Sequence, residues 1–293
     1  MQYNITAYST ALFSTWINIE QLGILFDAGD GVSAGLLQKS RKIKQVFITH
    51  PDRDHLTGLL QFNQLNARGD GFPKIYYPKD SGSFPAFEAF QGKFDPHVQN
   101  SVWKGIQHAD EILINKQLLV QAIRNNHIVA PAGVAKSLSY KIFDIKRKVK
   151  PEFAQLSGEE IKQIAISKGK DFLTEEVRRN VFSYSGDTPV DDFSRWDQSD
   201  ILIHESTFLD GDADLEIKTK KNAHSRIDEV FKMVSEIKVG QLVLSHFSSR
   251  YSREMIDQAI RRLCKAYQIQ IPVYAIYPGE IHRDILSQEP LNA

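Results

Sequence analysis

The segment from Val46 to Gly58 constrains the fold more than any other part of the chain. An apolar strand runs directly into His50, Asp52, Asp54 and His55. Four such side chains on one tight turn can surround one or two divalent ions, because imidazole nitrogen and carboxylate oxygen are both common ligands. A purely structural role would need all four to cap a helix, and a helix start uses only one of them. The run therefore predicts a metal site.

Three further apolar segments end in the same kind of residue. A carboxylate or an imidazole follows each of them, namely Asp187 after 181–184, Glu205 after 201–203 and His246 after 242–244. A single one of these would more often be a turn or a buried histidine than a ligand. Because sites in α/β folds form at the carboxyl ends of strands, their repetition predicts one shared site.

The remaining chain alternates short apolar segments with helical patterns, which indicates α/β layering. We expect buried strands at Leu22–Phe26, Gln45–Ile48, Lys74–Tyr77, Tyr140–Ile145, Val181–Tyr184, Asp200–Ile203 and Gln241–Leu244. Helices are expected at 225–239, capped by Ser225 and stopped by Gly240, from Ser157 onward, and at 253–267. No repeat or linker divides the chain, so residues 1–293 are expected to form a single domain.

Two segments are harder to assign. Residues 80–125 contain several aromatic side chains and suggest a lid or a packed helical insertion. The basic run 146–150 follows a predicted strand, and we expect it to be a solvated loop.

Composition limits the partners and the compartment. Lys+Arg and Asp+Glu both number 36, so the chain has no net charge that would attract nucleic acid or anionic membranes. The single cysteine, Cys264, excludes an intramolecular disulfide and fits a reducing compartment. No signal-like start and no stretch of about 18 apolar residues occurs. We expect a cytoplasmic protein with no membrane partner.

Together these motifs resemble the metallo-β-lactamase superfamily, whose signature is His-x-His-x-Asp-His, and in particular its ribonuclease Z-like branch. The resemblance covers most of the chain and is carried by residues 24–31, 46–58, 184–188, 204–208, 223–225 and 244–251. It implies an α/β fold of the metallo-β-lactamase type, an αββα four-layer sandwich. It also implies two divalent metal ions, with zinc as the first choice, and a homodimer.

The resemblance implies a ligand set: His50 and His127 for one ion, Asp54, His55 and His246 for the other, and Asp187 between them. His127 has only its neighbours in the sequence to mark it, and a loop histidine is the alternative. Asp52 stands where the family has its second histidine. It either ligates as a harder, anionic group, which favours manganese or iron, or it is too short and leaves a single ion.

Beside these ligands, the resemblance implies that His224 protonates the leaving group while Glu205 holds its other ring nitrogen. Asp54 is implied to be catalytic as well as a ligand. A surface histidine at a helix start is the alternative for His224, and His204 is expected to pack beside its strand.

The activity implied is hydrolysis of a phosphodiester, in a small nucleotide or RNA, by a metal-activated water. Enzymes of this branch that trim transfer RNA carry a long Gly/Pro-rich arm between the ligands matching His127 and Asp187. Residues 150–172 contain one proline and suggest an ordinary helix with loops, which favours a smaller phosphodiester. The alternatives are a hydrolase of carboxylic esters, thioesters or lactones, and a non-catalytic metal-binding protein with a decayed first site.

Overall fold

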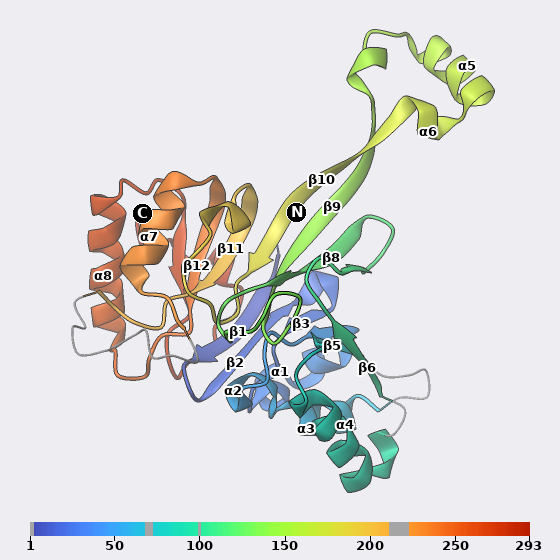
Figure 1. The fold of residues 1–293 in the computed structure, drawn as a ribbon. Coiled ribbons are helices and arrows are strands. Elements are labelled where there is room, and N and C mark those ends of the chain that lie inside the picture. Colours follow the sequence, from blue (N-terminus) through green and yellow to red (C-terminus); the bar gives the residue numbers. More distant parts are fainter. Residues whose placement is uncertain (1–2, 68–72, 99–100, 211–222) are drawn as a thin grey trace.

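The computed structural model describes residues 3–67, 73–98, 101–210 and 223–293. Two sheets face each other and carry helices on their outer faces (Figure 1). The first sheet has the strand order β1-β2-β3-β4-β5-β6, and the second has the order β13-β12-β11-β10-β9-β8-β7. Within the described residues, no helix combines the length and the apolar character needed to cross a bilayer.

The first half of the chain builds the first sheet and its helices. Its strands are β1 Ile5–Thr10, β2 Ser14–Ile19, β3 Ile24–Phe26, β4 Gln45–Phe47, β5 Lys74–Pro78 and β6 Val102–Ile106. Its helices are η1 Glu20–Leu22, α1 Val32–Leu36, η2 Leu37–Lys42, α2 Arg53–Leu56, α3 Leu59–Leu65, α4 Ser83–Phe94 and η3 Pro96–Val98. Strands β3 to β6 run parallel, so their carboxyl ends share one edge.

The second sheet follows in the same manner. Its strands are β7 Glu111–Leu113, β8 Leu118–Arg124, β9 Leu138–Val149, β10 Thr174–Tyr184, β11 Ser199–Glu205, β12 Val239–Ser245 and β13 Val273–Ala275. Its helices are η4 Pro151–Phe153, α5 Gly158–Lys168, α6 Lys170–Leu173, η5 Phe193–Trp196, α7 Ile227–Glu236, α8 Arg253–Ala266 and η6 Ile285–Ser287. Strands β10 to β13 are parallel.

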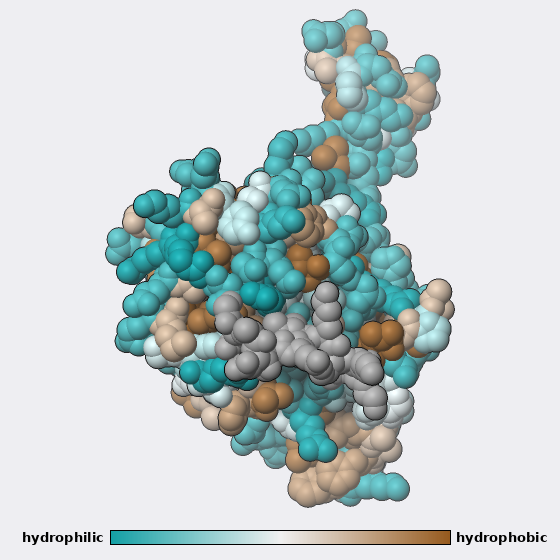
Figure 2. Space-filling model, turned by 60° about the vertical axis from the view of Figure 1, so that its left-hand side comes forward, coloured by the Kyte–Doolittle hydropathy of each residue, from teal (hydrophilic) through white to brown (hydrophobic). Residues whose placement is uncertain are grey.

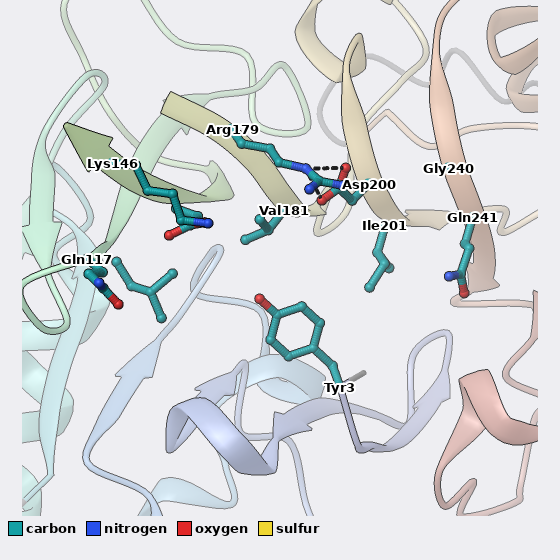
Figure 3. A pocket seen from close by; sticks show the side chains of 11 residues that line it. Tyr3, Gln117, Lys146, Arg179, Val181, Asp200, Ile201, Gly240 and Gln241 are labelled. Carbon is teal, nitrogen blue, oxygen red and sulfur yellow. Dashed lines mark hydrogen bonds and ion pairs between the residues drawn. The ribbon is translucent and has the colours of Figure 1, made fainter. Parts of the chain in front are cut away.

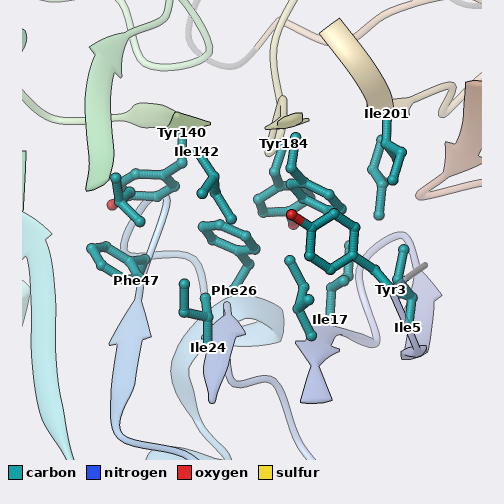
Figure 4. Packing of buried hydrophobic residues seen from close by; sticks show 14 of the residues in the cluster. Tyr3, Ile5, Ile17, Ile24, Phe26, Phe47, Tyr140, Ile142, Tyr184 and Ile201 are labelled. Atoms are coloured by element: carbon teal, nitrogen blue, oxygen red, sulfur yellow. The ribbon is translucent and has the colours of Figure 1, made fainter. Parts of the chain in front are cut away.

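Three apolar clusters join four layers. One cluster packs α1 and α3 against the first sheet, and another packs α7 and α8 against the second. The third fills the space between the sheets, where the Phe26 ring stacks on Tyr140 with ring centres 5.6 Å apart (Figure 4). Burial on this scale is the main source of stability in such a sandwich. The order helix, sheet, sheet, helix confirms the predicted architecture.

The predicted strands are all present, but the predicted helix 225–239 has wrong ends. Ser225 does not cap it, because its hydroxyl donates to the Thr188 carbonyl oxygen, and the helix begins two residues later. The helix ends at Glu236, and Gly240 lies inside β12 instead of stopping it. A Cβ on Gly240 would lie 2.5 Å from the Asp200 carbonyl oxygen, so glycine allows β11 and β12 to approach.

The basic run 146–150 is not a loop, and this prediction was wrong. Strand β9 continues through Val149 because it pairs with β10 down to Thr174, and the two form a long antiparallel ribbon. The ribbon projects from the body and carries α5 and α6 at its tip (Figure 1). The helix predicted from Ser157 onward is present as α5, and Ser157 caps it in a capping box with Glu160. Residues 150–172 are therefore the end of an arm and not an ordinary surface helix with loops.

The segment 80–125 is only partly a helical insertion. Helix α4 accounts for its aromatic first part, where Phe84 is buried against Tyr77 with ring centres 4.8 Å apart. The described residues that follow form β6 at the edge of the first sheet and then β7 and β8 of the second. The chain thus crosses between the two sheets within this segment.

Candidate metal centre

The turns after β4, β8, β10 and β12 meet at one end of the sandwich. They bring together the side chains implied as ligands. Three groups have ligand atoms within 4.8 Å of one another: His50, His127 and Asp187; Asp54, His55 and His246; and Asp187, His224 and His246. The histidines of the first two groups are fully or almost fully buried. Burying an imidazole whose nitrogens have no partner costs free energy. The hydrogen bonds of each ring therefore decide which of its nitrogens is left to bind a metal ion.

Two of these histidines are held through Asp27, a fully buried carboxylate. Asp27 accepts from the Thr49 backbone N–H at 2.7 Å, from the Tyr184 hydroxyl at 2.7 Å and from Nδ1 of His55 at 2.9 Å. The Thr49 hydroxyl also donates to Asp27, at 3.0 Å, so its oxygen accepts from Nδ1 of His50, at 2.9 Å. Both rings therefore carry their proton on Nδ1.

The other two histidines are fixed in the same sense. Nδ1 of His127 lies 3.0 Å from the Ala223 carbonyl oxygen, which can only accept. Nδ1 of His246 lies 2.9 Å from the Thr207 hydroxyl oxygen. Outer partners of this kind set the tautomer of metal-binding imidazoles and aim their free nitrogen.

The consequence appears at the opposite nitrogen of each ring. Nε2 of His50, His55, His127 and His246 is buried and has no hydrogen-bond partner. In the neutral ring each of these nitrogens carries the lone pair, and they face the carboxylates of Asp52, Asp54 and Asp187. Buried polar atoms are rarely left without a partner, and here the shared partner that satisfies them is a cation. The residues present thus fit a site for divalent metal.

Asp187 lies at the centre of the cluster. Its Oδ2 is 3.7 Å from Nε2 of His50, 3.4 Å from that of His55 and 3.3 Å from that of His246. Burial alone would raise the pKa of Asp187, but His246 and His55 hold it well below its usual range. An ionised carboxylate that contacts histidines of both groups is suited to bridge two ions.

The electrostatics of the cluster also call for a cation. Burial would lower the pKa of His55, but Asp187 and Asp27 raise it well above its ordinary value. Burial and the neighbouring His55 and His127 lower the pKa of His50. The carboxylates thus favour positive charge at His55, and a bound metal ion could supply that charge in place of a proton.

Asp52 reaches this cluster despite its short side chain. Its Oδ2 lies 3.7 Å from Nε2 of His50 and 3.8 Å from Nε2 of His127, and its side chain is 40% exposed. A carboxylate at that distance from both imidazoles can share an ion with them. The geometry therefore favours the ligating role of Asp52 over the alternative in which it is too short.

Asp54 faces the second group. Its Oδ2 lies 3.5 Å from Nε2 of His55 and 3.6 Å from Nε2 of His246. It also accepts a hydrogen bond from the Leu12 backbone N–H at 3.2 Å. Burial would raise the pKa of Asp54, but the neighbouring His246 and His55 lower it. Asp54 is thus an anion that can hold an ion or accept a proton.

His224 lies at the edge of the cluster with its ring stacked on that of His246, at 5.5 Å between centres. Its Nδ1 is 3.1 Å from Oε1 of Glu205, which is 1% exposed and also accepts from the Thr188 backbone N–H at 2.6 Å. Burial would lower the pKa of His224, but the Glu205 carboxylate raises it to about 9. The pair is therefore a protonated imidazole held by a fixed carboxylate. His204, by contrast, is buried against Trp196 away from these groups.

Thr207 is a positioning residue that the sequence analysis did not single out. Its hydroxyl lies 2.5 Å from Oε2 of Glu205, which can only accept, and 2.9 Å from Nδ1 of His246. Its single proton therefore goes to Glu205, and its oxygen accepts from His246. In the sequence, Thr207 is marked only by its position two residues after Glu205. That signal is weak, because threonine is common near strand ends.

Substituting Thr207 tests this arrangement. In Thr207→Val the tautomer of His246 is no longer fixed, so we expect metal affinity to fall about 10- to 100-fold, measured by competition with a chromogenic chelator. Thr207→Ser keeps the hydroxyl and should retain the affinity. Equal loss in both variants would show that packing, and not the hydrogen bond, is what matters.

A hollow of about 480 Å³ lies at the opposite end of the sandwich, at the base of the arm (Figure 3). The Tyr3 ring and the apolar Val181 and Ile201 face it, and Arg179 pairs with Asp200 at 2.8 Å on its rim. None of the clustered histidines lines it. This hollow is therefore separate from the candidate metal centre.

Comparison with known proteins supports the resemblance. The chain is 28% identical over 272 residues to tRNase Z TRZ1 of Arabidopsis thaliana, covering 89% of this chain and 91% of the relative. It is 28% identical over 277 residues to ribonuclease Z of Methanocaldococcus jannaschii, covering 83% and 82% of the two chains. No family model matches the chain.

The architecture is also found among solved structures. The metallo-β-lactamase fold protein YhfI of Bacillus subtilis superposes with a TM-score of 0.62 at 15% identity, covering 96% of this chain and 99% of the other. At that identity the likeness shows the fold alone. The predictions of a metallo-β-lactamase fold and of a ribonuclease Z-like sequence are confirmed.

Proposed function

We propose that this ribonuclease Z-like chain of the metallo-β-lactamase fold is a metal-dependent phosphodiesterase whose substrate is RNA. One observation carries the proposal: four buried histidine nitrogens with free lone pairs converge on Asp187, next to a protonated imidazole. That arrangement offers positive charge for a phosphate and a proton for the group that leaves it.

Two divalent ions are the implied cofactors, with zinc as the first choice because imidazole dominates the ligand set. His50, Asp52, His127 and Asp187 would hold one, and Asp54, His55, His246 and Asp187 the other. Bound ions of this kind polarise the phosphate and lower the pKa of a coordinated water. The oxygen of Asp52 adds a hard ligand that also makes manganese or iron acceptable.

The chain's own residues divide the remaining tasks. Asp54 is ionised and its side chain is 12% exposed, so it can orient the attacking water and take its proton. His224 carries the proton that the departing ribose oxygen needs, and Glu205 fixes the ring through Nδ1. After His224 has given its proton to the leaving oxygen, the negative charge of Glu205 favours protonation of the ring again.

The arm changes the expected size of the substrate. An ordinary helix with loops at residues 150–172 would favour a small phosphodiester, yet these residues form the end of a projecting ribbon. The arm surface is mostly hydrophilic (Figure 2). Its basic residues are Lys146, Arg147, Lys148, Lys150, Lys162, Lys168 and Lys170. Six acidic residues lie on the same segment, namely Glu152, Glu159, Glu160, Asp171, Glu175 and Glu176. Individual lysines along the extended arm, and not a net positive charge, would therefore contact the phosphates of a folded RNA, such as a precursor transfer RNA.

Two finer points belong to the same proposal. We expect a homodimer, in which the arm of one subunit would be available to RNA bound by the other. Light scattering should then report about twice the chain mass of 33.3 kDa.

A cytoplasmic location fits the single cysteine, Cys264, which is buried and cannot form a disulfide within the chain.

The direct test is a metal-resolved screen. Protein reconstituted with zinc, manganese or iron would be assayed on bis(4-nitrophenyl) phosphate, cyclic nucleotides and a precursor transfer RNA. We expect release of the 3′ trailer from the precursor. Hydrolysis of the chromogenic ester together with inert RNA would overturn the proposed substrate, and activity on carboxylic esters alone would favour the ester-hydrolase alternative.

Shortening the arm tests its part in binding RNA. Replacing residues 150–173 by a two-residue turn closes the ribbon at the pair Val149 and Thr174. We expect KM for precursor transfer RNA to rise at least tenfold, as for loss of several phosphate contacts, with turnover of bis(4-nitrophenyl) phosphate retained. If KM for RNA does not change, the arm does not bind the substrate.

A further inference from the structure

The turn that joins β1 to β2 exposes two large apolar side chains side by side. Leu12 is 89% exposed and Phe13 is 61% exposed. Single apolar residues on a surface are ordinary, but adjacent ones beside a catalytic site indicate a contact surface. The question is what they would contact.

The turn is fixed to the metal centre by backbone hydrogen bonds. The Leu12 N–H donates to Oδ2 of Asp54 at 3.2 Å, and the Ala11 N–H donates to the carbonyl oxygen of Phe247 at 3.1 Å. Asp54 is an implied ligand, and Phe247 directly follows His246, which is another. The two exposed side chains are therefore held at a set distance from the place where the phosphate is cleaved.

Phe13 also forms a wall of a hollow beside the turn. The hollow has a volume of about 450 Å³ and is further lined by Tyr8, Ser14, Trp16, Asp30, Gly31, Ala34, Gly35 and Ile281. The Tyr8 and Trp16 rings stack at 6.3 Å with an angle of 19° between their planes, and Ile281 is 44% exposed. The walls are thus aromatic and apolar, with one carboxylate.

We propose that this hollow is a subsite for an unpaired nucleobase next to the scissile phosphate, with the base stacked on Phe13. The inference rests on the proposed function. Stacking on an exposed aromatic ring is how proteins hold single-stranded nucleotides. A paired base is covered by its neighbours and could not enter, so the subsite would select substrates unpaired at this position.

The charge of the hollow favours a base over other parts of RNA. Among the described residues that line it, Asp30 is the only charged one, and it would repel a phosphate. Its oxygens can instead accept hydrogen bonds from the amino or imino groups of a base. The phosphates would then remain outside, on the side of the histidines.

The test compares a normal oligoribonucleotide with one that is abasic at the nucleotide beside the cleaved bond. In Phe13→Ala we expect Kd for the normal RNA, measured with a non-cleavable phosphorothioate analogue, to rise about tenfold or more. Phe13→Trp should retain binding. The matched control is Phe90→Ala, since Phe90 is 51% exposed on α4 and does not line this hollow.

The abasic RNA supplies the decisive comparison. Wild type should lose the same factor when the base is absent, and Phe13→Ala should lose nothing further. An equal effect of Phe13→Ala on both RNAs would overturn the subsite. A change from dimer to monomer in Phe13→Ala, with base discrimination intact, would assign the surface to a second copy of the chain and overturn it also. These binding measurements need no turnover. The proposed function is tested separately, by whether the wild-type protein cleaves RNA.

Discussion

Replacing His224 by alanine should lower kcat for RNA cleavage about 10²- to 10⁴-fold, the range expected for loss of a general acid. The ribose oxygen is a poor leaving group and needs the proton that His224 carries. Hydrolysis of bis(4-nitrophenyl) phosphate should fall much less, because 4-nitrophenolate leaves without protonation. The measurement is kcat on both substrates at equal metal content.

The pH profile supplies a second readout for the same residue. Because Glu205 raises the pKa of His224 to about 9, the acid is protonated at neutral pH, and activity on RNA should fall as pH rises through that value. Glu205→Gln removes the raising charge, so the pKa of His224 drops and the alkaline fall should move to lower pH. 4-Nitrophenyl esters should show neither effect.

His204→Ala serves as the matched control, since His204 is a buried histidine against Trp196 and is not part of the pair. Thermal unfolding compares the stability of both variants with that of wild type. In His204→Ala the ratio of the two activities should stay near the wild-type ratio. Near-unchanged RNA turnover in His224→Ala would contradict the leaving-group role and would favour hydrolysis of a carboxylic ester, which needs no such acid.

The candidate site was largely predictable because parallel strands end at one edge. Four apolar segments each led to a carboxylate or an imidazole, and the fold brings those ends together. Even Asp52, whose reach was in doubt, lies within 3.8 Å of two imidazole nitrogens. The sheet fixes the position of a residue that directly follows a strand, so the positions of these side chains follow closely from the strand order.

What the sequence could not predict depends on contacts between distant segments. Thr207 matters because it lies between His246 and Glu205, and no local pattern distinguishes it from other threonines. Asp27 holds two histidines through Thr49 and its own carboxylate, across 22 and 28 positions of the chain. Such partners become visible only when the turns are packed together.

The arm was missed for a different reason. Strands β9 and β10 pair with each other beyond the body, so their outer halves lack the apolar alternation that marks a half-buried strand. Lys146, Arg147 and Lys148 are charged because solvent surrounds the ribbon there, and a charged run was taken for a loop. Pairing between the two strands, and not burial, defines this element.

Asp187→Asn should abolish activity on both RNA and chromogenic phosphodiesters. Asp187 contacts histidines of both ligand groups through one oxygen, at 3.3 to 3.7 Å, so an amide would weaken both positions together. The carboxylate also supplies the charge that raises the pKa of His55. We expect the metal content, measured by mass spectrometry after dialysis, to fall from about two ions per chain to below one.

Asp52→Asn is the comparison that separates the two positions. Asp52 lies 3.7 Å from Nε2 of His50 and 3.8 Å from Nε2 of His127, so its loss should lower occupancy at that position and leave the ion held by Asp54, His55 and His246. About one ion per chain should remain. If Asp187→Asn kept both ions, Asp187 would not be the bridge. Asp52→Asn could also keep both ions, with an unchanged preference among zinc, manganese and iron. Asp52 would then not be a ligand, and the first ion would be held by imidazoles and Asp187 alone.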